Sequence, residues 1–338
     1  MANPFDYSVV IPCRNGDRTL GRALAHIGRL SPSPREIVVV DDASADGTRA
    51  TAVAAGARVV HFTEPVGAPR VRNAGGAAAN SRWLLFVDSD CYVTPGGFLE
   101  AVRLLQANDR LAGVMGVFAT VAPSGPFAGG YKNYFRHLEI AAMRNPPPSF
   151  TSSCFLIERE AFLRVGGFNE AYGRVPTEDN ELYFRLVKDG CVIPYLVAFE
   201  FVHDKPMGLW RLFTEDATRA AAIIVNLLGC LGEPGRGWSP GEKTTLALEV
   251  FGGILAAALP VALVLWFAGV GGAGALVLAG AGGCVILAGL LGDKLRRAWR
   301  DRGLWFAARL YLYRVVEMVA AAVGIVTGLG RAARRGFA

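Results

Sequence analysis

Two carboxylates separated by one serine, Asp88 and Asp90, directly follow the apolar run Trp83–Val87. This run has the length and composition of a buried strand. Carboxylates at the carboxyl end of a parallel strand face the crevice where open α/β sheets bind ligands, and two of them can share a divalent cation. An isolated Asp-x-Asp is equally typical of a turn after a strand. The neighbouring motifs must therefore decide between a metal-held phosphate and a turn.

Polar residues also follow the first two predicted strands. Pro12 and Asn15 come after the first strand, and Asp41 and Asp42 come after the second. Paired acids in that position are by themselves more typical of an Asx turn that caps a helix. Because parallel strands end at one edge of a sheet, we expect these loops to lie near the Asp-x-Asp motif. Carboxylates that accept from a base or ribose, with an arginine such as Arg72 nearby for phosphate, form a coherent nucleotide site.

Strands and helices alternate through the N-terminal half of the sequence. The patterns predict strands at residues 7–11, 36–40, 58–62 and 83–87, and helices at 20–30, 48–55 and 70–80. This alternation predicts an α/β, Rossmann-like fold with a mostly parallel sheet flanked by helices.

A second acidic segment lies near residue 180. Thr177 can cap a helix that carries Glu178 and Asp179 in its first turn and apolar side chains at Leu182 and Leu186 further along. Acids in a first turn often only complement the helix dipole. A carboxylate is also the kind of group that takes a proton from an attacking hydroxyl, so both roles remain open at this point.

Taken together, these motifs resemble those of the family 2 glycosyltransferases. The matching segments, in the order found in that family, are residues 9–15, 40–48, 72–75, 88–90, 166–170 and 178–179. The similarity covers about Asp6–His203. It implies a GT-A fold and an inverting transfer from a nucleotide-sugar, with a UDP-sugar as the donor common in the family.

The resemblance also assigns the donor site. The donor-binding set that it implies is Pro12, Asn15, Asp41, Asp42, Arg72, Asn73, Asp88 and Asp90. Asp42 is expected to hold the base ahead of Asp41, and Asp90 is expected to be the direct metal ligand, with Asp88 beside it. His203 is a third candidate ligand, although a lone histidine is more often structural. The implied cofactor is Mg²⁺ or Mn²⁺, which would act as a Lewis acid as the nucleotide leaves.

Later motifs describe the acceptor side. The resemblance assigns the general-base role to Asp179, with Glu178 as a neighbour that orients it or raises its pKa. It implies that the turn Gly166-Gly167-Phe168 shapes the pocket for the sugar and the acceptor, although paired glycines can simply make a tight turn.

Two departures from the family narrow the reaction. Processive polymer synthases in the family carry a Gln-x-x-Arg-Trp after the acidic helix, and this sequence has only Trp210-Arg211, which is not an adequate substitute. Transfer of a single hexose-type sugar is therefore favoured. The Asp-x-Asp is not extended as in the typical dolichol-phosphate sugar synthases, which disfavours a bare polyprenyl phosphate as acceptor.

The C-terminal part of the sequence is strongly apolar. Hydrophobic residues make up 52% of the 338-residue chain, and long uncharged stretches are concentrated after residue 245. Phe251–Val270 and Ala273–Gly292 are each long enough to span a bilayer. The basic segment Lys294–Arg302 favours the cytoplasmic side. Leu304–Leu329, which has charges in its first part, is expected to be an interfacial or re-entrant helix.

The sequence therefore predicts four regions. They are a cytoplasmic GT-A domain at residues 1–205, an interfacial helix and linker at 206–245, a transmembrane hairpin at 246–292, and a basic loop with a C-terminal interfacial or re-entrant helix at 293–338. The start lacks a basic-then-apolar leader, so the catalytic domain is expected on the cytoplasmic side of the inner (plasma) membrane.

The cysteines argue against a zinc site or a disulfide framework, and the charge distribution argues against nucleic acid as a partner. The six cysteines contain no Cys-x-x-Cys pair, which argues against a zinc site and a disulfide framework, and we interpret them as reduced thiols. The formal net charge of +6 lies largely beside apolar segments, which favours anionic lipid headgroups over nucleic acid as a partner.

The leading hypothesis is a transferase that moves one sugar to a membrane-associated, lipid-linked acceptor. A sugar nucleotidyltransferase is an alternative, but it should carry a glycine-rich phosphate loop after the first strand, and Pro12–Gly16 is not one. A catalytically degenerate scaffold that binds nucleotide is another, and the intact Asp88, Asp90 and Asp179 disfavour it.

Overall fold

The computed structural model describes residues 5–121, 127–143, 147, 150–172, 178–229 and 240–334. The chain divides into two compact units, Met1–Pro206 and Met207–Ala338.

An eight-stranded sheet forms the centre of the N-terminal unit, in the order β3-β2-β1-β4-β7-β6-β8-β5. The strands are β1 (Tyr7–Cys13), β2 (Glu36–Asp42), β3 (Arg58–Phe62), β4 (Trp83–Val87), β5 (Cys91–Val93), β6 (Gly113–Phe118), β7 (Cys154–Glu158) and β8 (Tyr195–His203). The first four strands are parallel, as expected. β7 runs antiparallel to β4 and β6, and β5 runs antiparallel to β8. The α/β fold is therefore confirmed, with a sheet that is mixed beyond β4.

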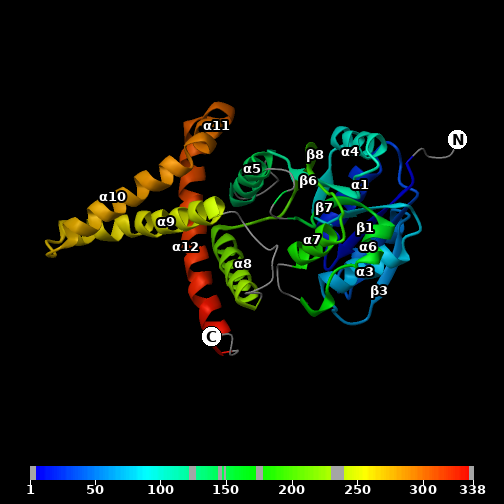
Figure 1. Ribbon diagram of the computed structural model, residues 1–338, viewed down its shortest axis with the longest axis horizontal. Helices are drawn as coiled ribbons and strands as arrows, with labels where there is room; N and C mark the ends of the chain where they lie inside the picture. Colours follow the sequence, from blue (N-terminus) through cyan, green and yellow to red (C-terminus); the bar gives the residue numbers. More distant parts are fainter. Residues whose placement is uncertain are drawn as a thin grey trace. The chain divides into compact units, whose positions relative to one another are not determined.

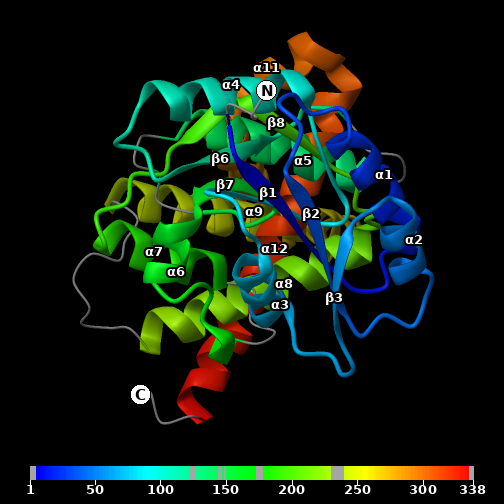
Figure 2. The ribbon, with the colours of Figure 1, turned by 90° about the vertical axis from the view of Figure 1, so that its right-hand side faces the viewer.

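Helices cover both faces of this sheet. Figure 2 shows α1 and α2 on one side of β1–β3, and α3 and α6 on the other. The helices of this unit are α1 (Asp17–Ile27), α2 (Thr48–Ala54), α3 (Ala68–Ala78), α4 (Pro95–Ala107), α5 (Phe127–Ala141), α6 (Arg159–Arg164) and α7 (Glu178–Lys188), with a short 3-10 turn at Glu170–Tyr172. Alternation along β1 explains the two layers: Val9 and Ile11 pack in the cluster that holds Leu20, whereas Val10 packs in the cluster that holds Phe162.

The register of the parallel strands brings three loops to one edge. Cys13, at the end of β1, pairs with Asp41 near the end of β2, and β4 runs parallel to β1 on its other side. The polar segments that follow these three strands therefore leave the sheet together, at the edge where open α/β sheets bind ligands.

The described residues of the C-terminal unit form five helices. They are α8 (Leu209–Gly229), α9 (Pro240–Phe267), α10 (Ala273–Leu290), α11 (Gly292–Arg302) and α12 (Leu304–Arg334). In Figure 1, α9 and α10 form a hairpin and α8 runs beside α12. A Cβ atom added at Gly283 would lie 2.4 Å from the Leu255 Cβ, so the glycines of α10 permit the close approach of these two helices.

Two segments of this unit have the length and apolar composition of a membrane span. They are Ala273–Leu290 and Leu304–Arg331, and the apolar part of α9, Phe251–Phe267, is shorter. The expected hairpin at 251–292 corresponds to α9 and α10. The segment at 304–329, expected to be interfacial or re-entrant, lies within one unbroken helix that by length and composition could also cross a membrane. Its charges at Arg314 and Glu317 are buried and pair at 2.9 Å, which lowers the cost of placing them in an apolar unit.

Candidate active site

The loops after β1 and β2 are held to one another by hydrogen bonds. The Asn15 backbone N–H donates to Ser44 Oγ at 2.8 Å, and the Asn15 Oδ1 accepts from the Ala45 N–H at 2.9 Å. Gly16 N–H donates to Thr48 Oγ1 at 2.9 Å. Asn15 adopts a left-handed φ of 52°, a conformation that asparagine tolerates better than most residues. Asn15, expected to bind the donor, thus also fixes the shape of the loop.

The paired acids at the end of β2 have different surroundings. The Asp41 side chain has no exposed surface; it accepts from the Ser44 N–H at 3.1 Å and lies 3.0 Å from His61 Nδ1. Asp42 accepts from the N–H groups of Val66 at 2.6 Å and Gly67 at 3.3 Å. Asp41 therefore makes a turn contact of the kind that its Asx-turn interpretation predicts, and Asp42 holds the backbone that precedes α3.

A buried arginine joins β4 to α7. Arg72 Nη2 lies 2.8 Å from Asp88 Oδ1, and Nη1 lies 3.4 Å from Glu178 Oε1. Its guanidinium also stacks over the Phe168 ring at 5.4 Å. Burial opposes the charge of Arg72, but the carboxylates of Asp88 and Glu178, with a contribution from Asp179, outweigh it and raise the pKa of the guanidinium. The Asp-x-Asp motif and the acidic helix, about ninety residues apart, thus share one centre.

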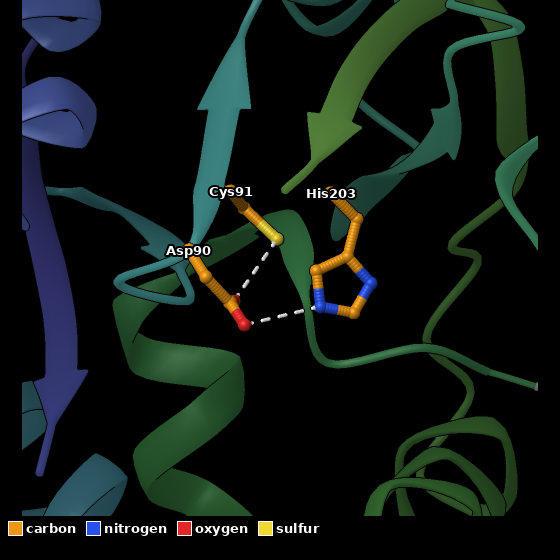
Figure 3. Close-up of side chains that lie close together, drawn as sticks. All are labelled: Asp90, Cys91 and His203. Carbon is orange, nitrogen blue, oxygen red and sulfur yellow. Dashed lines mark hydrogen bonds and ion pairs between the residues drawn. The ribbon is translucent and has the colours of Figure 1, made fainter. Parts of the chain in front are cut away.

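Asp90 points to a different set of partners from Asp88. Cys91, the first residue of β5, is paired across the strands with His203, the last residue of β8. Figure 3 shows the side chains of Asp90, Cys91 and His203 converging: Asp90 Oδ2 lies 3.3 Å from His203 Nε2, and Oδ1 lies 3.9 Å from Cys91 Sγ. Burial would raise the pKa of Asp90, but the hydrogen bond and charge of His203, with Lys205, outweigh it and lower that pKa.

Buried polar residues brace the junction of β5 and β8. The Asp204 N–H donates to the Asp90 carbonyl at 2.8 Å, and Asn133 Nδ2 donates to the His203 carbonyl at 2.9 Å. The Asp204 carboxylate is buried and accepts from Tyr92 Oη at 3.0 Å and from Arg22 Nη1 at 2.5 Å. Asp204 was not among the residues expected in the site, although it directly follows the candidate ligand His203 in the sequence.

The turn Gly166-Gly167-Phe168 is shaped by its glycines and pinned by Asn73. Both glycines have a positive φ, of 80° and 65°. Asn73 Oδ1 accepts from the Phe168 N–H at 2.7 Å, and Asn73 Nδ2 donates to the Phe168 carbonyl at 2.8 Å. A Cβ atom on Gly167 would lie 2.4 Å from Asn73 Oδ1. Asn73, expected in the donor set, is used in this structure to hold the acceptor-side turn.

An open cavity of about 430 Å³ lies against this turn. All three residues of the turn line it, together with Asn73, Glu181 and Arg185. Arg185 Nε pairs with Glu181 at 2.7 Å, and its Nη2 donates to the Gly167 carbonyl at 2.7 Å, so α7 supports the wall of the cavity. This is the place where the sequence predicts the acceptor pocket.

Asp179 lies in the first turn of α7, beside Glu178. Its Oδ1 accepts from the Asn180 N–H at 2.8 Å and from Asn180 Nδ2 at 3.3 Å, and these contacts orient the carboxylate. Thr177, expected to cap this helix, lies outside the described residues. The structure therefore brings Arg72, Asp88 and the two acids of α7 together. Asp90 follows in the short link between β4 and β5, and it contacts His203 at the end of β8.

Comparisons with known proteins identify the class of this domain. Residues 8–166 match the family described as Glycosyl transferase family 2. A pre-mycofactocin glycosyltransferase of Mycobacterium tuberculosis is 27% identical over 209 residues, which cover 59% of this chain and 43% of that protein. An N-acetylglucosaminyl-diphospho-decaprenol L-rhamnosyltransferase of the same species is 29% identical over 123 residues, which cover 36% of this chain and 38% of that protein.

A solved structure supports the fold. A mannosyltransferase from Pyrobaculum calidifontis, in complex with GDP-Man and Mn²⁺, aligns with a TM-score of 0.57 at 18% identity and covers 96% of this chain and 88% of that one. The chain spans less than half the length of the two curated relatives named above. The fold and the family match agree with the expectation from the sequence: residues 8–166 belong to the family 2 glycosyltransferases.

Proposed function

We propose that this protein is an inverting glycosyltransferase that moves one sugar from a nucleotide-sugar, a UDP-sugar by preference, to a lipid-linked acceptor at a membrane. The observation that carries the proposal is the double ion pair of Arg72 with Asp88 and Glu178. It supports the proposal because Arg72 joins Asp88, expected to handle the donor, to the helix expected to supply the base, and a single displacement requires both ends to be close together.

The donor end combines fixed charges with a candidate metal site. Asp42 would receive the base, and Arg72 would face the diphosphate. The buried Arg72 Nε has no hydrogen-bond partner within the described part of the chain, so it is available to a phosphate oxygen. Carboxylate and imidazole donors at Asp90 and His203 suit a divalent cation, and a bound Mg²⁺ or Mn²⁺ would supply Lewis-acid stabilisation of the leaving diphosphate.

The acceptor end supplies the base. Asp179, oriented by Asn180, would take the proton from the acceptor hydroxyl as that oxygen attacks the anomeric carbon. The attack comes from the side opposite the diphosphate, so the configuration of the sugar inverts. Glu178, held by Arg72, would keep the first turn of α7 in place, and the cavity beside Gly166-Gly167-Phe168 would receive the acceptor.

The proposal of a lipid-linked acceptor rests on the apolar C-terminal unit and on one relative. Helices α10 and α12 are long and apolar enough to cross a membrane. A catalytic domain kept at the cytoplasmic face of the inner membrane would meet a lipid-linked hydroxyl by diffusion in two dimensions, while the soluble donor arrives from the cytoplasm. The relative that is named for a diphospho-decaprenol acceptor favours the same class of acceptor.

The test is a donor panel with the full chain in detergent. Purified protein is incubated with each of several nucleotide-sugars, extracted membrane lipids and Mg²⁺ or Mn²⁺, and the lipid products are analysed by mass spectrometry. We expect the mass of one added hexose-type unit, release of nucleoside diphosphate, and loss of both when the metal is chelated.

Other outcomes would identify the alternatives. Formation of a nucleotide-sugar from a sugar phosphate and a nucleoside triphosphate would replace the proposal with a nucleotidyltransferase. Nucleotide binding with no turnover of any donor would favour a degenerate scaffold.

A further inference from the structure

We propose that Cys91 is a thiolate ligand in the candidate metal site, so that Asp90, Cys91 and His203 together bind a borderline-soft dication such as Zn²⁺ or Co²⁺ in competition with the Mg²⁺ or Mn²⁺ of the proposed function. The inference deepens the proposed function, because it concerns the same position between β5 and β8. It differs from the expectation that the cysteines, lacking a Cys-x-x-Cys pair, take no part in a zinc site.

The backbone makes this juxtaposition possible. Cys91 and His203 are direct partners across the antiparallel pair of β5 and β8, and Asp90 immediately precedes Cys91. Directly opposed residues on one face of a sheet have Cβ atoms about 5 Å apart, so their side chains can reach one ion. Three ligands thus come from two short segments that are far apart in the sequence, which is why spacing rules for zinc motifs do not detect them.

The three side chains lie within reach of one ion, and Asp90 meets His203 and Cys91 through its two different carboxylate oxygens. With zinc–sulfur bonds of about 2.3 Å and zinc–nitrogen or zinc–oxygen bonds of about 2.0 Å, neighbouring ligand atoms are separated by about 3.3–3.6 Å. Asp90 Oδ2 lies 3.3 Å from His203 Nε2, and Asp90 Oδ1 lies 3.9 Å from Cys91 Sγ. All three ligand atoms lie within 4.8 Å of one another. Small side-chain rotations would therefore close the set around one cation.

The chemistry of the donor set determines which ions it prefers. One sulfur, one imidazole nitrogen and one carboxylate oxygen form a set that zinc binds readily, whereas Mg²⁺ prefers oxygen ligands and octahedral geometry. On binding, the thiol would release its proton to solvent and the sulfur would form a bond to the ion. A tetrahedral ion held by three protein ligands keeps only one position for a diphosphate oxygen, so zinc would displace the catalytic ion without replacing it.

Cobalt spectroscopy tests the thiolate bond directly and needs no sugar transfer. The full chain in detergent, stripped of metal, is titrated with Co²⁺, and its near-ultraviolet absorbance is recorded. We expect an intense thiolate-to-cobalt charge-transfer band that saturates at one ion per chain. In Cys91→Ala and in the size-matched Cys91→Ser the band should be absent, whereas Cys154→Ala, which removes a neighbouring buried thiol outside the ligand set, should keep it.

Competition measures the consequence for the site. Mn²⁺ bound to the protein is followed by electron paramagnetic resonance while Zn²⁺ is added. We expect zinc to displace Mn²⁺ from the wild type at a concentration at least about tenfold lower than from Cys91→Ser, a ratio typical of the loss of a metal ligand or its support. A wild-type cobalt complex without the charge-transfer band, a band that persists in both Cys91 variants, or equal displacement by zinc would each overturn the proposal. Because none of these readouts involves a sugar, their failure is distinguishable from failure of the proposed transferase activity.

Discussion

The two halves of the central sheet present their functional side chains in different ways. In the half formed by β1 to β4, acidic side chains lie at the end of a parallel strand or directly after it, as Asp42 and Asp88 do. In the half formed by β5 to β8, they come from the strand ends themselves, and cross-strand pairing places Cys91 beside His203. The first arrangement is set by where strands end, and the second by which residues face each other.

This difference explains why the acids of the parallel half can be located from sequence patterns, whereas the pairing of Cys91 with His203 cannot. An apolar run that stops at an acid marks the end of a buried strand, so the loops of the parallel half can be found without a structure. The register between β5 and β8 depends on the whole intervening chain. Consequently Cys91 emerges as a member of the site with Asp90 only when the strands are paired, whereas His203 was already expected at this site from the family resemblance. Substitutions in the two halves should therefore have different effects, of which the largest is expected at Asp90.

Replacing Asp90 should nearly abolish transfer. Asp90→Asn removes a carboxylate that is expected to bind the metal. Because a bound metal ion contributes several kcal/mol of charge stabilisation in the transition state, we expect kcat/KM to fall by about a thousandfold. Nucleotide release is measured with the full chain, and thermal unfolding checks the fold. Asp189→Asn, a surface acid that pairs with Arg164, is the matched control and should stay near wild type. Substantial activity in Asp90→Asn would mean that the ion is held elsewhere.

Replacing Arg72 should weaken the link between Asp88 and helix α7. Arg72→Lys keeps the charge but cannot pair with Asp88 and Glu178 at once through a planar fork. Misplacement of these groups should lower kcat by about a hundredfold and lower the Tm by a few degrees. A variant within threefold of wild type would show that the double ion pair is not needed to align the site.

Replacing Asp204 should affect the metal more than the nucleotide. Asp204→Asn weakens the buried contacts with Tyr92 and Arg22 that brace the junction of β5 and β8. Supporting residues of this kind typically change metal affinity by about tenfold or more. Mn²⁺ affinity, measured by electron paramagnetic resonance, should fall while UDP affinity without metal stays unchanged. Equal losses of both would indicate a general loss of structure.

The smallest effect is expected at the glycine turn. Gly166→Ala and Gly167→Ala each place a Cβ on a residue with positive φ, at a cost of about 1 kcal/mol. Only Gly167→Ala also meets Asn73 Oδ1, at 2.4 Å, so it alone should release the pinned turn. We expect a lower Tm for Gly167→Ala than for Gly166→Ala, and an acceptor KM raised several-fold only in Gly167→Ala. Identical KM values would remove the turn from the acceptor pocket.

The sequence was sufficient for the first four strands and for the acids that follow them, because local periodicity and chain breaks encode both. Beyond β4 it indicated strands near residues 155–158 and 195–202, where β7 and β8 lie, but not β5, which has only three residues, or β6, which lacks an alternating pattern. It did not indicate that β7 is antiparallel to β4, or that Asn73 would bind the glycine turn. Those outcomes depend on which backbone groups come within reach after folding.

The helices of the C-terminal unit follow from composition more clearly than their relation to a membrane does. The uncharged runs of α9 and α10 are evident from composition alone. In α12 the charges at Arg314 and Glu317 suggested an interfacial or re-entrant helix, and in the structure they are buried, lie three residues apart and pair with each other. A pair of charges on one helical face is therefore weaker evidence against a span than the same charges would be singly.

The most direct test of the central claim is one comparison made on Asp179→Asn: the affinity for UDP with Mn²⁺, measured by calorimetry, against the rate of sugar transfer by the same preparation. The account predicts an affinity within about twofold of wild type and a transfer rate lower by about 10²–10⁴-fold, the usual contribution of a general base. A transfer rate within tenfold of wild type, or a loss of nucleotide affinity as large as the loss of rate, would contradict it.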